Sequence, residues 1–163
     1  MDAFLAAMAW GYGNVGYGPW RVAQALEDPQ AAVKVLQVAT ALHEEGALAA
    51  YSLMATECRL NRIGPAFGTK FLYFADSGCH AHRALILDRL VADWLNAHTT
   101  PPVIPVPWSL STYEAYLDRM HCWAAALGVK PDALELAMFS DMAEARGNQW
   151  AGPGPTMSSR TPK

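Results

Sequence analysis

The chain lacks several features that assign a protein to a class directly. Among its 163 residues no apolar run reaches the roughly 18 residues of an ordinary transmembrane helix. The start, Met1 to Leu5, has no basic segment and carries an acid at the second position, which argues against a secretory signal. Charged residues make up only 17% of the chain and hydrophobic residues 52%, so the composition is that of a folded domain rather than of a disordered chain.

Cysteine is also scarce. Cys58, Cys79 and Cys122 cannot all pair with one another, and none belongs to a CxxC motif. The pattern disfavours a disulfide framework and a four-cysteine iron–sulfur cluster, and it indicates free thiols in a reducing cytoplasm. His80 and His82 share one loop, but no third ligand follows at a recognisable spacing, so no metal and no other cofactor is expected.

The charge is unevenly distributed. The whole chain has a net charge of −3, which does not indicate a polyanionic partner. Between Arg59 and Arg89, however, five basic residues stand against two aspartates, a local balance of +3. This window is the part of the chain most suited to bind an anion.

Hydrophobic periodicity predicts a single all-α domain of seven or eight helices. Asp28-Pro29 is typical of a helix start, and Ser111 to Glu114 forms a capping box for a helix that Gly128 ends. Pro131-Asp132 begins a last helix. Apolar residues between Leu85 and Leu95 recur at helical spacing and predict a largely buried helix.

Three segments depart from this helical pattern. Residues 10–20 contain four glycines among aromatic residues and are expected to form a loop between helices. Residues 103–107 are too rich in proline for a central strand and are expected to form an extended linker. Residues 147–163, rich in glycine, proline and serine, are expected to be disordered, which leaves residues 1–146 as the folded domain.

The segment from Arg62 to Ala75 carries the most informative pattern. Gly64-Pro65 predicts a tight turn, and a helix begins again immediately after it. A helix N-terminus presents free backbone N–H groups that bind phosphate, as do nearby arginine and lysine side chains. Any connection between two helices could contain Gly-Pro, so the turn alone is weak evidence for a nucleic-acid partner.

Ile63-Gly64-Pro65, Gly68-Thr69-Lys70 and Asp88, 18 residues after the lysine, together resemble the helix-hairpin-helix DNA glycosylase superfamily, and within it the 8-oxoguanine DNA glycosylase-like branch. The resemblance implies an all-α glycosylase-like domain that contains a helix-hairpin-helix motif. It also implies double-stranded DNA with a flipped damaged base as the partner. The expected contacts with the DNA backbone are Arg62, Gly64, Gly68 and Thr69.

The hairpin departs from the family pattern, hydrophobic-x-Gly-hydrophobic-Gly. Arg62 stands where the family has its first glycine. Two registers are open for the second glycine. If it is Gly64, the family's lysine position falls on Ala66; if it is Gly68, Lys70 and its spacing to Asp88 are retained, and this register is preferred.

The resemblance further implies that Lys70 and Asp88 are catalytic. A carboxylate stabilises the positive charge that develops on the deoxyribose when an N-glycosidic bond breaks. A neutral lysine amine that attacks C1′ forms a covalent imine, from which β-elimination nicks the strand. The apolar neighbours of Lys70 in the sequence favour the neutral amine. The structural alternatives are a surface lysine and, for Asp88, a helix N-cap or an ion pair with Arg83 or Arg89.

Base excision also requires flat side chains that hold a flipped nucleotide. Trp10, Gly11, Tyr12 and Trp123 are the predicted base pocket, because aromatic rings stack on bases and glycine allows the backbone to approach a base edge. Trp20 and Trp108 are further aromatic candidates.

The leading hypothesis is a DNA glycosylase and AP lyase that excises an oxidised purine, with 8-oxoguanine as the first candidate. The alternatives are a catalytically silent DNA-binding module, a specialised glycosylase acting on modified or foreign DNA, and a protein–protein interaction domain on the same scaffold. The negative net charge favours a non-catalytic protein, whereas a lysine and an aspartate in the family's order favour the enzyme. Neither a membrane nor an obligate protein partner is inferred.

Overall fold

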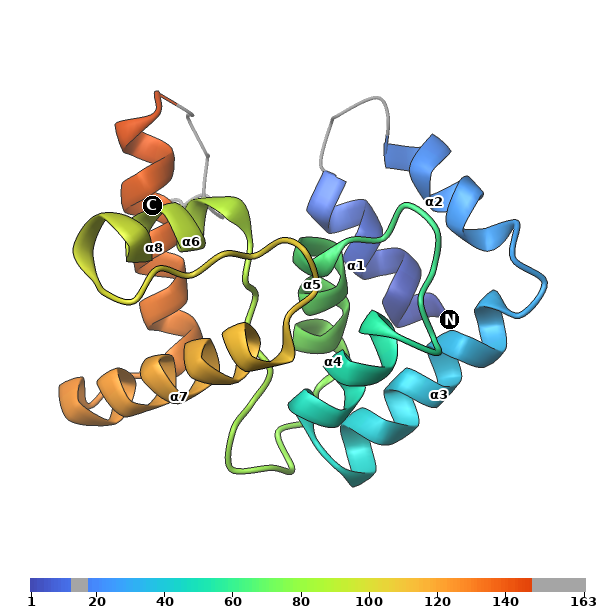
Figure 1. Ribbon diagram of the computed structural model, residues 1–163, viewed down its shortest axis with the longest axis horizontal. Helices are drawn as coiled ribbons and strands as arrows, with labels where there is room; N and C mark the ends of the chain where they lie inside the picture. The colour runs from blue at the N-terminus through green and yellow to red at the C-terminus, as the bar shows by residue number, and fades with distance from the viewer. Residues whose placement is uncertain (13–17, 148–163) are drawn as a thin grey trace, which may run out of the picture.

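The computed structural model describes residues 1–12 and 18–147, and these residues form eight α-helices and no strand (Figure 1). The predicted all-α fold is confirmed. The helices are α1 (Asp2–Tyr12), α2 (Gly18–Leu26), α3 (Ala31–Glu44), α4 (Ala47–Ala55), α5 (Pro65–Ala75), α6 (Arg89–His98), α7 (Leu110–Leu127) and α8 (Pro131–Ala145). None of these helices is long and apolar enough to cross a membrane. Residues 148–163, on which the prediction of a disordered tail falls, lie outside the described residues.

The C-terminal end of α7 and the start of α8 follow the predicted cap chemistry, whereas the start of α7 does not. Pro131 begins α8, and Gly128 ends α7 with a φ of 67°, the left-handed conformation that glycine adopts at low cost. The predicted capping box is two residues out of register. Ser109, not Ser111, is the N-cap of α7, and its hydroxyl accepts a hydrogen bond from the Thr112 N–H at 3.3 Å.

The start of α3 is corrected in a similar way. The sequence predicts a start at Asp28-Pro29, but α3 begins at Ala31. The Asp28 carboxylate instead accepts from the Gln30 N–H at 2.8 Å and pairs with Lys34 at 2.6 Å. Asp28 therefore forms a side-chain turn in front of the helix rather than its N-cap.

The prediction of a helix from Leu85 onward is wrong for its first residues. Leu85, Ile86 and Leu87 have no helical structure, although all three are buried, and α6 begins only at Arg89. A short apolar run that is buried on all sides has the same composition in an extended segment as in a helix, so periodicity alone does not distinguish them. We call the extended residues 84–88 the bridging segment.

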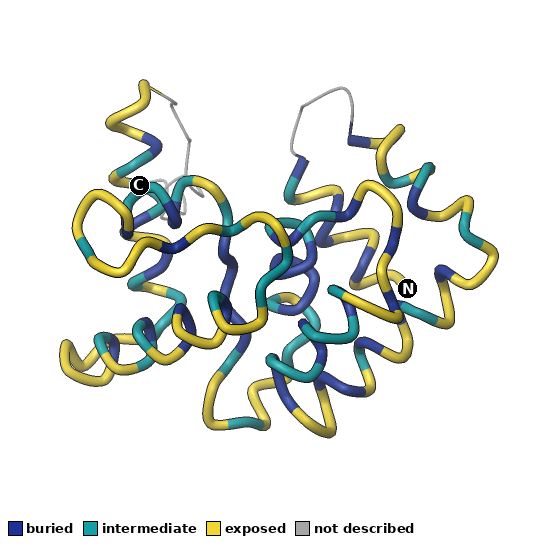
Figure 2. Tube along the Cα trace, viewed as in Figure 1, coloured by how far each residue is buried: buried dark blue, intermediate teal, exposed yellow. Residues whose placement is uncertain are grey.

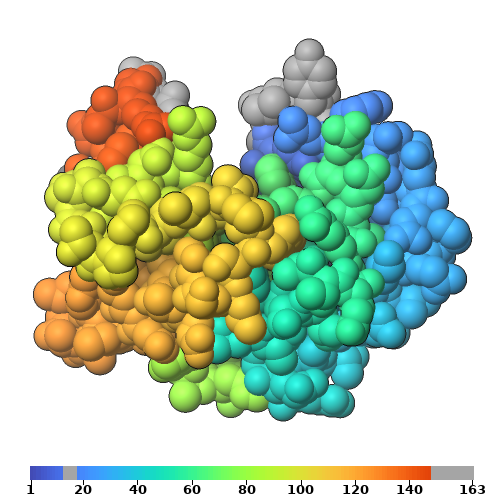
Figure 3. All heavy atoms as spheres, viewed as in Figure 1, coloured from blue at the N-terminus to red at the C-terminus, as the bar shows by residue number. Residues whose placement is uncertain are grey.

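α5 occupies the centre of the molecule (Figure 1). It packs against α1, with Phe4 and Phe71 in edge-to-face contact at 5.3 Å, and also against α3 and α4. α6, α7 and α8 form a second group on the other side, in which α8 packs on both α6 and α7. Buried residues concentrate in α5 and in the bridging segment, which joins the two groups (Figure 2). The surface is notched between the α6–α8 side and the α1–α2 side (Figure 3).

Candidate active site

Lys70 and Asp88 meet where the two helix groups join. Lys70 lies on α5, and Asp88 is the N-cap of α6. The Lys70 Nζ lies 3.1 Å from the Asp88 Oδ2, and the two side chains are only 8% and 15% exposed. A nearly buried ion pair costs desolvation free energy that a surface pair does not, so its presence in a domain of this size is a first indication of function.

The Asp88 carboxylate is fixed by a second set of contacts. Its Oδ1 accepts hydrogen bonds from the Leu90 N–H at 3.0 Å and from the Val91 N–H at 3.2 Å, which caps α6. Its other oxygen is left for Lys70. The carboxylate therefore has one structural oxygen and one oxygen that faces an amine.

Side chains from neighbouring elements hold the bridging segment in place of a partner strand. Thr69, the residue before Lys70, accepts from the Leu87 N–H at 3.1 Å, so two successive residues of α5 hold two successive residues of the segment. Two carboxylates accept from its backbone: Asp76 from the Ala84 N–H at 2.7 Å and Glu135 from the Ile86 N–H at 2.7 Å. Two tyrosine hydroxyls donate to it: Tyr113 to the Leu85 carbonyl at 2.9 Å and Tyr116 to the Ile86 carbonyl at 2.8 Å. These bonds satisfy buried backbone groups that would otherwise cost free energy.

Glu135 is a site residue that the sequence patterns did not reveal. It lies on α8 with 8% of its surface exposed, and burial raises its pKa to about 8 despite the hydrogen bond from Ile86. The negative charge of Asp88 raises this pKa further, and the positive charge of Lys70 lowers it. The sequence did contain one indication that Glu135 is buried. Glu135 precedes the buried Met138 by three residues, so the two side chains lie on the same face of α8.

The Phe67 ring lies beside Lys70, and two of the predicted pocket residues lie against this pair. The Lys70 Nζ lies 5.7 Å from the centre of the Phe67 ring, and Tyr12 stacks on that ring at 4.0 Å. A Cβ atom on Gly11 would lie 2.8 Å from the Lys70 Cδ and 2.9 Å from Phe67, so only glycine allows this approach. Trp108 covers Gly68 in the same way, because a Cβ atom on Gly68 would overlap the indole ring.

The other two predicted pocket residues lie apart from Lys70. Trp10 is 52% exposed and contacts Phe74 at 5.1 Å, toward the end of α5. Trp123 packs against Arg119 at 5.9 Å on the second half of α7, which runs away from α5 (Figure 1). The structure thus brings Gly11 to the lysine and Tyr12 to the neighbouring Phe67 ring, and it gives Trp10 and Trp123 other neighbours.

The predicted DNA-binding residues divide into surface and interior positions. Arg62 is exposed and adopts a φ of 64°, the left-handed region that glycine favours, at the position where the family has a glycine. Gly64 is the N-cap of α5. Gly68 and Thr69 are buried inside α5, and the Thr69 hydroxyl is engaged with Leu87, so neither residue faces solvent. Gly68 is therefore not a turn residue, and the glycine at the turn is Gly64.

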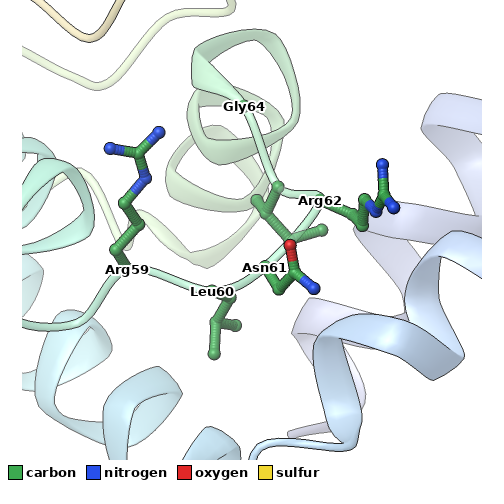
Figure 4. Close-up of a pocket in the computed structure, with 6 residues that line it drawn as sticks. Arg59, Leu60, Asn61, Arg62 and Gly64 are labelled. Carbon is green, nitrogen blue, oxygen red and sulfur yellow. The ribbon is translucent and has the colours of Figure 1, made fainter.

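The loop between α4 and α5 forms a surface depression of about 510 Å³ lined by residues 59–64 (Figure 4). The side chains of Arg59 and Arg62 extend from opposite ends of this loop (Figure 4). The Arg62 guanidinium lies 5.4 Å from the centre of the Trp20 ring, which is itself exposed. The loop therefore presents two cations to solvent, and the exposed Trp20 ring of α2 lies beside one of them.

No group of three or more histidine, cysteine, aspartate or glutamate side chains within the described residues has the geometry of a metal site. His82 pairs with Asp118 at 3.3 Å and stacks on His121 at 4.7 Å. His80 contacts the His43 carbonyl at 3.0 Å. These histidines have structural partners on the surface.

A comparison with protein-family models matches residues 1–139 to the family described as "Putative 8-oxoguanine DNA glycosylase OGG-like protein". The match covers most of the chain, including the whole Lys70–Asp88 site. No curated protein and no solved structure matches the chain. The chain belongs to this OGG-like family.

Proposed function

We propose that this member of the OGG-like family is a DNA glycosylase and AP lyase that excises an oxidised purine, with 8-oxoguanine as the first candidate, from double-stranded DNA. The observation that carries the proposal is the nearly buried contact of 3.1 Å between Lys70 and Asp88. An amine and a carboxylate at hydrogen-bond distance are the two groups that this reaction requires.

Lys70 is the proposed nucleophile. Its ammonium must first lose a proton, and the Asp88 carboxylate is the acceptor within reach. The Lys70 Nζ then attacks C1′ of the flipped nucleotide while the N-glycosidic bond breaks. The bonding electrons leave with the base, which takes up the proton that Asp88 had accepted, so the Asp88 carboxylate is charged again as the sugar cation develops. Opening of the sugar ring gives an imine, and loss of a C2′ proton expels the 3′ phosphate.

Asp88 has a second proposed role in the same step. As the glycosidic bond lengthens, positive charge develops on the deoxyribose. The Asp88 Oδ2 is available to stabilise this charge because the cap hydrogen bonds to α6 use the other oxygen. The carboxylate is thus preorganised and does not have to reorient during the reaction.

Tyr12 and Trp108 support a base pocket beside Lys70. The Tyr12 hydroxyl and the Trp108 Nε1 are buried atoms with no hydrogen-bond partner among the described residues. Buried polar atoms ordinarily find a partner, so these two are suited to the polar edge of a bound base. We propose Gly11, Tyr12, Phe67 and Trp108 as the residues that contact the base.

The loop between α4 and α5 is the proposed grip on the DNA backbone. Arg59 and Arg62 supply positive charge, and Gly64 leads into the N-terminus of α5, which has no acidic residue in its first turn. Both features favour phosphate. Gly68 and Thr69 contribute from the interior, by placing Lys70 and the bridging segment.

A second function is favoured by one observation. In the free protein the Lys70 amine is paired with Asp88, and a paired ammonium is not a nucleophile. A protein that kept this arrangement on DNA would be a silent binding module. The two functions differ in whether a covalent intermediate forms.

Borohydride trapping on an 8-oxoguanine duplex tests the proposal. We expect the wild-type protein to form a reduced covalent adduct and to nick the strand, and Lys70→Gln to do neither while it still binds the duplex. Lys130→Gln, at an exposed lysine between α7 and α8, is the matched control and should trap normally. Binding without trapping by the wild-type protein would identify the silent module, and trapping by Lys70→Gln would assign the nucleophile elsewhere.

A further inference from the structure

One buried acid outside the Lys70–Asp88 pair contacts the bridging segment from a different helix. Glu135, on α8, accepts a hydrogen bond from the Ile86 N–H at 2.7 Å. A buried carboxyl group is costly unless it has such a partner. Ile86 is two residues before Asp88, so Glu135 holds the backbone that leads to the carboxylate.

The same residue of the segment is held from α7 as well. The Tyr116 hydroxyl donates to the Ile86 carbonyl at 2.8 Å, and it lies within hydrogen-bonding reach of the Glu135 side chain. Both backbone polar groups of Ile86 therefore have side-chain partners, one from α8 and one from α7. No strand among the described residues pairs with the segment, so its position depends on these side chains.

We propose that Glu135 is a positioning residue for the reaction, because its bond to Ile86 fixes where the bridging segment presents Asp88 to Lys70. This inference rests on the proposed function of the Lys70–Asp88 pair. The Asp88 carboxylate must cap α6 with one oxygen and reach Lys70 with the other, which leaves little freedom for the backbone before it. A displacement of about 1 Å is enough to slow a reaction that depends on such an arrangement.

Three variants separate positioning from stability. Glu135→Gln keeps an oxygen that accepts from Ile86 and an amide that can donate to Tyr116. Glu135→Leu has a similar volume and no acceptor. Met138→Ala, one turn further along α8, removes a buried apolar side chain and lowers stability without removing a hydrogen bond to the segment.

The first measurement is the single-turnover excision rate at saturating protein, with the dissociation constant for the duplex measured in parallel. We expect Glu135→Leu to lower the rate by about tenfold to a hundredfold while the dissociation constant is unchanged. Glu135→Gln should excise at the wild-type rate. Met138→Ala should also excise at the wild-type rate, at a temperature where this variant is folded. If Glu135→Leu does not fold, Tyr116→Phe removes the second bond to Ile86 and should lower the rate in the same way.

The second measurement does not depend on activity. Amide hydrogen exchange of residues 86–91 should accelerate in Glu135→Leu more than in Met138→Ala, because the segment and the Asp88 cap loosen locally. An unchanged excision rate, an equal loss of rate in Met138→Ala, or exchange no faster than in Met138→Ala would overturn the proposal. If the wild-type protein excises nothing, the proposed function fails, and the exchange measurement still decides whether Glu135 positions Asp88.

Discussion

At the scale of single residues, the site depends on Asp88 having two different oxygens. One oxygen accepts the N–H groups of Leu90 and Val91, and the other contacts Lys70. A residue with this double role can be tested by a substitution that preserves the cap and removes the charge, because asparagine caps helices as well as aspartate does.

We expect Asp88→Asn to slow excision by roughly a hundredfold or more, because the charge that we propose stabilises the sugar cation is lost. The amine remains, so borohydride trapping should still occur, but slowly. The melting temperature should fall although the cap is kept, because the nearly buried Lys70 ammonium loses its charged partner. Wild-type excision kinetics in Asp88→Asn would show that the carboxylate has only its structural role.

Gly11 is important because it has no side chain, which leaves room for the Lys70 side chain beside α1. A Cβ atom there would lie 2.8 Å from the Lys70 Cδ, so the lysine side chain has to move if any other residue is present. We expect Gly11→Ala to reduce trapping by about tenfold or more while duplex binding is retained. Ala9→Ser, at an exposed position on the same helix, is the control and should trap normally. Normal trapping by Gly11→Ala would show that the position of Lys70 is not critical.

At the scale of elements, the loop between α4 and α5 combines charge with an unusual backbone. Arg62 has a φ of 64° and is exposed, which is a costly conformation for a residue with a side chain. Arginine is therefore present at a position that glycine would occupy with less strain. The positive charge of Arg62 is a sufficient reason for keeping arginine at this position. The Arg62 guanidinium lies over the Trp20 ring and faces solvent.

Two substitutions of Arg62 separate its charge from its backbone. Arg62→Gly keeps the left-handed conformation, and we expect it to weaken duplex binding for all sequences alike and to lower the slope of the salt dependence, with no loss of stability. Arg62→Glu should weaken binding more. Lys130→Glu changes the net charge equally at an exposed site outside the loop and should bind nearly as the wild-type protein does. Equal binding by all of these variants in a salt titration would place the DNA elsewhere.

The bridging segment is the element on which the site most depends. Helix α5 supplies Thr69 and Lys70, α7 supplies two tyrosine hydroxyls, and α8 supplies Glu135. Buried tyrosines whose hydroxyls donate to the segment stay protonated, since burial raises the pKa values of Tyr113 and Tyr116 well above that of free tyrosine. The segment thus joins the two groups of helices through side-chain hydrogen bonds.

At the scale of the whole molecule, the buried acid between these helix groups links stability to pH. The pKa of Glu135 is about 8 in the folded protein, against a reference value of 4.5. Burial is the main cause, and Asp88 and Asp132 raise it further, whereas Lys70 and the Ile86 N–H lower it. The folded state therefore binds this proton more tightly than the unfolded state.

The sign of the effect follows from this difference. The contribution of Glu135 to stability is complete below about pH 4.5 and is lost as the pH rises through about 8, by up to about 5 kcal/mol. We expect denaturant unfolding to show a decline in stability over this range, and Glu135→Gln to flatten it. Glu144→Gln, at an exposed glutamate on the same helix, should leave the decline unchanged. A wild-type stability that does not fall between these pH values would contradict the burial of an uncharged Glu135.

The sequence by itself determined the all-α class, the C-terminal end of α7 and the start of α8. These properties depend on local periodicity, on cap residues and on short motifs, all of which act within a few turns of chain. The start of α3 and the capping serine of α7 lie about two residues from their predicted positions because several polar residues compete at each helix end.

Only the tertiary structure decided that residues 84–88 are extended, that Thr69 faces inward, and that Glu135 binds the Ile86 N–H two residues before Asp88. An extended segment without a partner strand is stable only if side chains from other elements satisfy its backbone. Those side chains come from α5, which precedes the segment, and from α7 and α8, which follow it. Tertiary packing also placed Gly11 beside Lys70, Tyr12 against Phe67, and Trp123 on the second half of α7. The packing of α1 on α5 and the direction of α7 are properties of the assembled fold.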